Sequence, residues 1–279
     1  MSSMIYSRLW GKWDELPSSY PLACHLLDTA AIAVALWDTY LTDGERRVIA
    51  AAFGVEVDAV RGMVAFWAGL HDLGKCCPSF QGQMSGPRPD FLSEKEFESA
   101  PGWMHEEPVR HERVTHLVVP SLLAAYGYDV ASRPGRSVAH QVAQILGGHH
   151  GVYGPMLDRA TMADPGRAEP RIGVATGWME QRSALVDVVH EACGRPAAPT
   201  KTAPGGVAVM VTGLVVLADW LASHADWVRR RLGEWRASGG SDWFAHHTRA
   251  VKAAPRGGGP GATGAARVAG RDFLRGGVP

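Results

Sequence analysis

Apolar residues recur at intervals of three and four along most of the chain, which is the period of an amphipathic helix. A clear example lies after Leu22, where Leu26, Ala30, Ala33 and Trp37 share one helix face. The same pattern predicts helices over residues 22–41, 57–73, 108–126, 137–147, 176–192 and 207–235. No run of residues alternates between apolar and polar over the length of a strand, so an all-α fold is expected.

Two features interrupt this helical pattern. Residues 78–107 are rich in Pro, Gly, Ser and Glu and predict a long loop. Pro120 falls inside the helix predicted over 108–126 and is expected to kink or end it, because proline lacks the backbone N–H. The helix over 207–235 is apolar almost all round in its first half, which predicts a central place in the core.

The composition is that of a globular protein. The 279 residues are 46% hydrophobic and 20% charged, with a formal net charge of zero, which argues against a histone-like protein held on nucleic acid by bulk charge. The four cysteines form no regular framework, the N-terminus has no apolar signal region, and the longest apolar stretch is Val207–Leu217. We therefore expect a cytoplasmic protein without a membrane partner.

Twelve histidines are the less ordinary feature of the composition, and several lie beside acids or beside each other. Taken singly, each has a plain structural interpretation, such as a hydrogen-bonded pair at a helix end or a solvated turn. Asp219 is harder to explain in this way, because a carboxylate in the most apolar helix is costly unless it is paired or bound to metal. The candidate residues are His25, His71, Asp72, His111, His149, His150 and Asp219.

This set of side chains suits a particular class of metal. Neutral imidazoles with carboxylates favour borderline divalent ions such as Mn, Fe, Co, Ni or Zn over calcium. Seven ligands exceed the need of one metal but suffice for two metals bridged by one carboxylate, with positions left open for water and a phosphate oxygen. Magnesium, which prefers oxygen ligands, is expected to bind poorly.

The order H…HD…H…HH…D is similar to that of the HD metal-dependent phosphohydrolase superfamily. The segments HLLDTA, LHDLGKCCPSFQ, GGHHG and LADWLAS more narrowly resemble the HD nuclease domain of the type I CRISPR-associated nuclease–helicase. The resemblance extends over about residues 10–235. It implies an HD-domain helical bundle over residues 1–240 with a metal site between helices, followed by a flexible Gly/Arg-rich linker or tail over 241–279.

The resemblance also implies a role for each residue. One metal would be held by His25, His71, Asp72 and Asp219. Asp72 would bridge to a second metal held by His111, His149 and His150. Lys75 would act beside the scissile phosphate, and Ser223 would line the DNA path. His105 and His116 flank His111, but the R-H-E context of the family favours His111.

The activity implied by the resemblance is hydrolysis of phosphodiester bonds of single-stranded DNA by metal-activated water, in CRISPR interference against foreign DNA. The implied partners are a CRISPR helicase domain or subunit and the guide-RNA surveillance complex, although the chain itself contains no G-x-G-K-T or D-E-x-H helicase motif. Two alternatives stay open from the residues alone. The chain could be an HD-type nucleotide or cyclic-nucleotide phosphohydrolase, or a non-catalytic binding module of a CRISPR complex.

Overall fold

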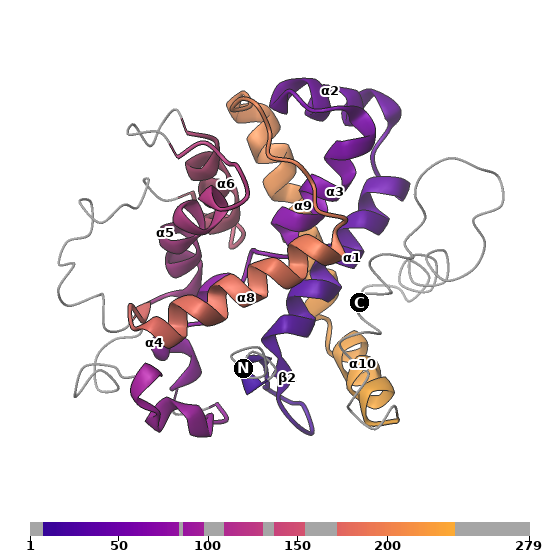
Figure 1. Ribbon diagram of the computed structural model, residues 1–279. Helices are drawn as coiled ribbons and strands as arrows, with labels where there is room; N and C mark the ends of the chain where they lie inside the picture. The colour runs from indigo at the N-terminus through magenta and orange to yellow at the C-terminus, as the bar shows by residue number, and fades with distance from the viewer. Residues whose placement is uncertain (1–7, 84–85, 98–108, 131–136, 154–171, 238–279) are drawn as a thin grey trace.

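The computed structural model describes residues 8–83, 86–97, 109–130, 137–153 and 172–237 (Figure 1). Its helices are α1 (Leu22–Thr39), α2 (Asp43–Phe53), α3 (Val57–Ala68), α4 (Pro78–Gln81), α5 (His111–Ala124), α6 (Val138–Gly147), α8 (Thr176–Ala192), α9 (Gly205–Ser223) and α10 (Ala225–Ala237). Three 3₁₀ turns are η3 (Leu73–Lys75), η4 (Asp90–Ser93) and η5 (Lys95–Phe97). This helical fold confirms the predicted all-α class.

Helix α1 lies at the centre of the bundle, where it packs against α3 and α9. Its buried positions include Leu26, Ala30, Ala33 and Trp37, the face that its apolar spacing predicts. In Figure 1, α5 and α6 lie together on one side of the molecule, and α8 runs across the front. Helix α1, which carries His25, is thus packed against α9, which carries Asp219, and against α3, which leads into the HD motif.

A two-stranded antiparallel sheet, β1 (Trp10–Lys12) paired with β2 (Tyr20–Pro21), precedes α1. It was not predicted, because three residues are too few for apolar and polar positions to alternate visibly. Leu22 extends the contact between the two segments by donating its backbone N–H to the carbonyl of Leu9. The sheet holds β1 against the start of α1, the helix that carries His25.

Several predicted elements differ from the structure. Helix α2 was missed, although Thr42 and Glu45 form a capping box at its start. The loop predicted over 78–107 contains α4, η4 and η5, while residues 98–107 lie outside the described ranges. Helix α5 continues past Pro120 to Ala124, so the proline does not end it.

The helix predicted over 207–235 is two helices. His224 adopts an extended conformation and separates α9 from α10. Because of this break, α10 packs back on α1, where Arg231 Nε lies 3.3 Å from Oδ1 of Asp28 and the indole N–H of Trp227 donates to Oδ2 of Asp28. The predicted tail at 241–279 lies outside the residues that the structure describes.

Helices α1 and α9 are also long and apolar enough to meet a length and composition criterion for membrane-spanning helices. Within the fold, 67% of the most apolar window of α1 is buried, and 39% of that of α9. Each of the two helices carries a buried polar residue of the candidate site, His25 in α1 and Asp219 in α9. The apolar character of α1 matches its place in the core. Helix α9 packs on α1, but its Val209 and Trp220 are 55% and 69% exposed, so the central place expected for this helix holds for one of its faces only.

Candidate metal centre

The HD motif lies where the chain leaves α3. The backbone turns after Ala68, and His71 and Asp72 lead into η3. Nδ1 of His71 is 2.8 Å from the carbonyl oxygen of Ala68, to which it donates, so Nε2 faces inward and carries the lone pair when the ring is neutral. Metal-bound histidines commonly have this second hydrogen bond, which fixes both the ring and its tautomer.

The first ligand group lies between α1, the HD motif and α9, with all of its members buried: His25, His71, Asp72 and Asp219. Their ligand atoms all lie within 4.8 Å of one another. Nε2 of His25 is 3.1 Å from Oδ2 of Asp72 and 3.2 Å from Oδ1 of Asp219. Nε2 of His71 is 3.3 Å and 3.2 Å from the same two oxygens, respectively.

The second ligand group lies between the start of α5 and the turn after α6. It consists of His111, His149 and His150, whose ligand atoms also lie within 4.8 Å of one another. Nε2 of His111 is 3.0 Å from Nε2 of His150. Nδ1 of His149 lies 2.6 Å from the carbonyl oxygen of Leu146, which leaves its Nε2 directed at the site.

Asp72 connects the two groups. Its Oδ2 faces His25 and His71, while its Oδ1 is 3.1 Å from Nε2 of His111 and 3.5 Å from Nε2 of His149. One carboxylate thus presents a different oxygen to each group, which is the arrangement of a bridging ligand. The structure brings all seven predicted ligands together in this way.

The site fits divalent cations. Nε2 atoms of His25, His71 and His149 are buried, and within the described part of the chain they make no hydrogen bond. Buried polar atoms in folded proteins are almost always hydrogen-bonded, so three such atoms converging on two carboxylates call for an explanation. A divalent ion supplies it, because it accepts the imidazole lone pairs and neutralises the carboxylates.

The charges of the first group are strongly coupled. Burial lowers the pKa of His71, but Asp72 and Asp219 outweigh it and raise that pKa to about 9. Burial favours the neutral acid of Asp72, yet Lys75 and His71 hold the pKa of this carboxyl well below its usual range. His71 and His25 likewise lower the pKa of Asp219. Both carboxylates are therefore ionised at neutral pH.

The second group favours neutral imidazoles. Burial, together with His149 and His111, lowers the pKa of His150 to about 4. Burial also lowers the pKa of His111, against the opposing effect of Asp72. An imidazole must be neutral to bind a metal. Because the lowered pKa values keep His111 and His150 neutral at pH 7, these two rings can bind a metal without first losing a proton.

Two contacts hold the HD motif against α5. The backbone N–H of Gly74 donates to Oγ1 of Thr115 at 2.8 Å, and this hydroxyl donates to the carbonyl of His71 at 3.0 Å. A Cβ on Gly74 would lie 2.0 Å from the carbonyl oxygen of His111. The glycine of H-D-L-G-K therefore permits the close approach that brings His111 to Asp72.

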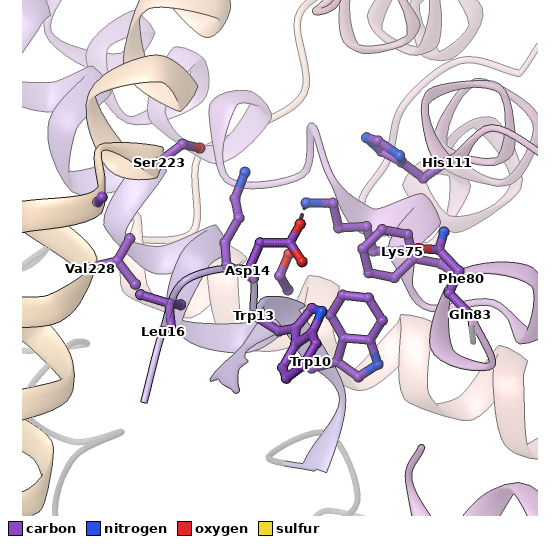
Figure 2. Close-up of a pocket in the computed structure, with 13 residues that line it drawn as sticks. Trp10, Trp13, Asp14, Leu16, Lys75, Phe80, Gln83, His111, Ser223 and Val228 are labelled. Carbon is purple, nitrogen blue, oxygen red and sulfur yellow. Dashed lines mark hydrogen bonds between the residues drawn. The ribbon is translucent and has the colours of Figure 1, made fainter. Parts of the chain in front are cut away.

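The two predicted substrate residues lie beside the ligands. Nζ of Lys75 is 2.7 Å from Oδ2 of Asp72 and donates to the carbonyl of Gly11 at 2.9 Å. Oγ of Ser223 donates to Oδ1 of Asp219 at 2.8 Å. Both residues line a pocket of about 360 Å³ that opens beside the ligand groups (Figure 2). Their roles toward substrate stay predictions.

Sequence reasoning missed three residues that shape this pocket: Lys12, Trp13 and Gln81. Lys12 and Trp13 line the pocket itself. The buried amide of Gln81 donates to the carbonyls of Trp10 and Lys75 and accepts from the N–H of Trp10. These hydrogen bonds attach β1 to the HD motif. Only the Gln of the C-C-P-S-F-Q segment carried a signal in the sequence, through the family resemblance.

The neighbouring histidines are placed differently. His116 lies on α5 and belongs to neither ligand group, and its ring packs against Gly147. His105 lies outside the described residues. Of the flanking candidates that the structure describes, His111 is the one that reaches Asp72.

Comparison with known proteins agrees with this geometry. The family model described as "Cas3, HD domain" matches residues 10–228. The chain is 30% identical over 219 residues to the CRISPR-associated endonuclease/helicase Cas3 of Thermus thermophilus, covering 77% of this chain and 22% of that protein.

Solved structures give the same result. A crystal structure of T. fusca Cas3 with AMPPNP superposes with a TM-score of 0.71 at 34% identity, covering 89% of this chain and 26% of that one. A chain in a CRISPR RNA-guided surveillance complex, in a pre-nicking state, gives 0.71 at 35% identity, covering 88% and 28%.

The chain spans about a quarter of the length of these relatives. Within that quarter, the match includes the HD motif and the ligand groups on either side of Asp72. Since the family model matches well over half of the residues, this chain belongs to the family of Cas3 HD domains.

Proposed function

We propose that this chain is the nuclease domain of a CRISPR-associated system and hydrolyses phosphodiester bonds of single-stranded DNA. The observation that carries the proposal is the position of Asp72 between two ligand groups, one of which reaches an open pocket through His111. A pair of divalent ions beside a pocket is a recurring arrangement in enzymes that cleave phosphate esters.

The seven side chains would hold two divalent metals. His25, His71 and Asp219 with Oδ2 of Asp72 would hold one, and the second histidine group with Oδ1 of Asp72 the other. When bound, such ions activate water and neutralise charge on the phosphate oxygens. Lys75 keeps Asp72 ionised through its 2.7 Å contact, so the bridging carboxylate stays available.

The ligand chemistry supports transition metals as the cofactors. Five of the seven side chains are imidazoles, which suit Mn, Fe, Co or Ni. Magnesium prefers six oxygen ligands in near-ideal octahedral geometry and is expected to be a poor cofactor.

The relatives support a wider context for the activity. The T. thermophilus relative is named an endonuclease/helicase, and another neighbour is part of an RNA-guided surveillance complex. We infer that a helicase domain or subunit delivers the single strand to this chain. A guide-RNA surveillance complex would expose that strand in foreign DNA, so that cleavage serves interference.

Incubation with circular single-stranded DNA tests the proposal. A circle has no ends, so any linear product reports internal cleavage. We expect cleavage with Mn²⁺, loss of cleavage with EDTA, and little action on the same sequence as a closed duplex. Hydrolysis of nucleotides or cyclic nucleotides without any cleavage of the circle would identify a nucleotide phosphohydrolase instead, and metal binding without hydrolysis of either would identify a binding module.

A further inference from the structure

The pocket beside the ligand groups has a wall that none of the ligands forms. This wall is the end of β1 and the residue after it, and it presents Lys12 and Trp13 to the pocket. Figure 2 shows Trp10 and Trp13 along one side of the pocket, with His111 and Ser223 on the far side from them. The wall is therefore next to the metal centre and shares its solvent space.

The two lysines of the pocket differ in their surroundings. Nζ of Lys75 is engaged by both Asp72 and Gly11, and its side chain is 5% exposed. The side chain of Lys12 is 27% exposed, and its Nζ is 3.9 Å from Oδ1 of Asp219. Lys12 thus holds a positive charge at the open side of the first ligand group, within reach of an incoming anion.

Trp13 supplies a different surface. Trp13 lines the pocket and is 37% exposed to solvent. Trp10, by contrast, is 4% exposed and packs on Phe80 with ring centroids 4.4 Å apart. Trp13 is accordingly the indole of this wall that can offer a face to a ligand.

The wall is rigidly attached to the metal centre. Gln81 hydrogen-bonds the backbone of Trp10 on both its N–H and its carbonyl, and Lys75 donates to the carbonyl of Gly11. A Cβ on Gly11 would lie 3.0 Å from the Cα of Leu22, so β1 sits close against the start of α1. The backbone from which Lys12 extends is thus held at a fixed position relative to Asp72.

We propose that Lys12 and Trp13 form a nucleotide subsite next to the scissile bond. Lys12 binds a phosphate adjacent to the one being hydrolysed, and Trp13 stacks on the base of that nucleotide. Lysine binds phosphate as a point charge, and stacking on an aromatic ring accepts any base, so the subsite favours single strands without sequence preference. Asp14 also lines the pocket. Because a carboxylate repels a phosphate, the phosphate binds at the end of the wall formed by Lys12. The inference rests on the proposed function.

The first test is the salt dependence of KM for a short single-stranded oligonucleotide with Mn²⁺. Lys12→Gln should raise KM about fivefold to tenfold and flatten the slope of log KM against log salt concentration by about 0.7, the contribution of one phosphate contact on a single strand. Lys12→Arg should restore the slope. Lys201→Gln, which removes an exposed lysine outside the pocket, should leave the slope unchanged.

Bound Mn²⁺ is measured on the same variants. Metal content equal to that of the wild type supports a substrate role for Lys12. Loss of metal in Lys12→Gln, or an unchanged salt slope, would overturn that role.

The second test uses oligonucleotides in which each base in turn is replaced by an abasic site. Trp13→Leu should raise KM about tenfold on the complete strand, and this penalty should disappear when one particular base is missing. Tyr40→Leu, which removes an exposed aromatic ring far from the pocket, should have no such effect.

The same penalty at every abasic position would overturn the stacking role of Trp13. Failure of the wild type to cleave any single strand would remove the proposed function and the subsite with it. Normal cleavage by the wild type and by both variants would remove the subsite alone.

Discussion

His25 and His71 direct their Nε2 atoms at the same oxygen, Oδ1 of Asp219, each at a distance of 3.2 Å. Neither nitrogen makes a hydrogen bond to any described residue. Two imidazole nitrogens and a carboxylate oxygen that converge without bonding to one another surround the position of a cation. Asp72 turns one oxygen to this group and the other to His111 and His149, which is the geometry that the proposed second cation requires.

Replacement of the bridging carboxylate should remove the activity. We expect Asp72→Ala to lose cleavage and most of its bound metal, because both ligand groups share this residue. Asp72→Asn keeps the size of the side chain and should lose the same functions while its helical circular dichroism persists. Asp226→Ala, at an exposed ion pair on α10, is the matched control. Full activity in either Asp72 variant would contradict the bridging assignment.

Gly74→Ala should disturb the second ligand group while sparing the first. The added Cβ would lie 2.0 Å from the carbonyl of His111 and 2.5 Å from the N–H nitrogen of Thr115, so α5 must move away from η3. We expect a loss of about 1–3 kcal/mol in the free energy of unfolding and a fall in bound metal toward one ion.

The control for this substitution is Gly213→Ala, because a Cβ on Gly213 meets nothing within 4 Å. That variant should be as stable as the wild type or slightly more so, since alanine favours a helix over glycine. Wild-type stability and metal content in Gly74→Ala would show that the close approach to α5 is not required.

Metal preference should follow the ligand types. We expect cleavage of single-stranded DNA with Mn²⁺, Co²⁺, Ni²⁺ or anaerobic Fe²⁺, little cleavage with Mg²⁺ alone, and loss of cleavage with EDTA. The assay compares initial rates on one substrate with each ion. Robust cleavage with Mg²⁺ that survives both His149→Ala and His150→Ala would mean that the oxygen ligands alone form the site.

His116 should make the protein less stable in mild acid. Burial, with help from His140, lowers the pKa of His116 to about 4, below the value near 6.5 of an unfolded chain. Between these values the unfolded chain binds the extra proton, so the stability that neutral His116 contributes is complete above pH 6.5 and is lost as the pH falls toward 4.

Urea unfolding of the wild type and of His116→Leu at pH 7 and pH 4.5 measures this contribution. The other buried histidines affect both proteins equally, so the variant should lose about 1–3 kcal/mol less than the wild type between the two pH values. Equal losses would show that His116 is not held neutral by the fold.

The candidate ligand set was predictable from sequence through its members taken together, because His25 and His111 do not stand out singly. An H-D pair after an apolar helix and an acid inside the most apolar helix carry a desolvation cost that a metal would remove, and a tandem histidine between glycines adds further candidate ligands. Their order along the chain then matched a known family. The helix over 176–192 was predicted with the same bounds as α8, since its apolar spacing is regular.

The remaining features depend on contacts that are distant in sequence. The break between α9 and α10 lets Arg231 reach Asp28, far earlier in the chain, and no local pattern around His224 marks it. Lys12 and Trp13 gain a place in the site because Gln81 and Lys75, more than sixty residues later, bind the backbone of β1. Helix α2 is a different case, because its capping box at Thr42 and Glu45 was visible in the sequence.

Anomalous diffraction from crystals soaked in MnCl₂ tests the two-metal centre, because it locates each ion without reference to activity. We expect two manganese peaks that share Asp72. One should lie among His25, His71 and Asp219, and the other among His111, His149 and His150. A single peak, or peaks that leave Asp72 without a metal, would contradict the two-metal centre.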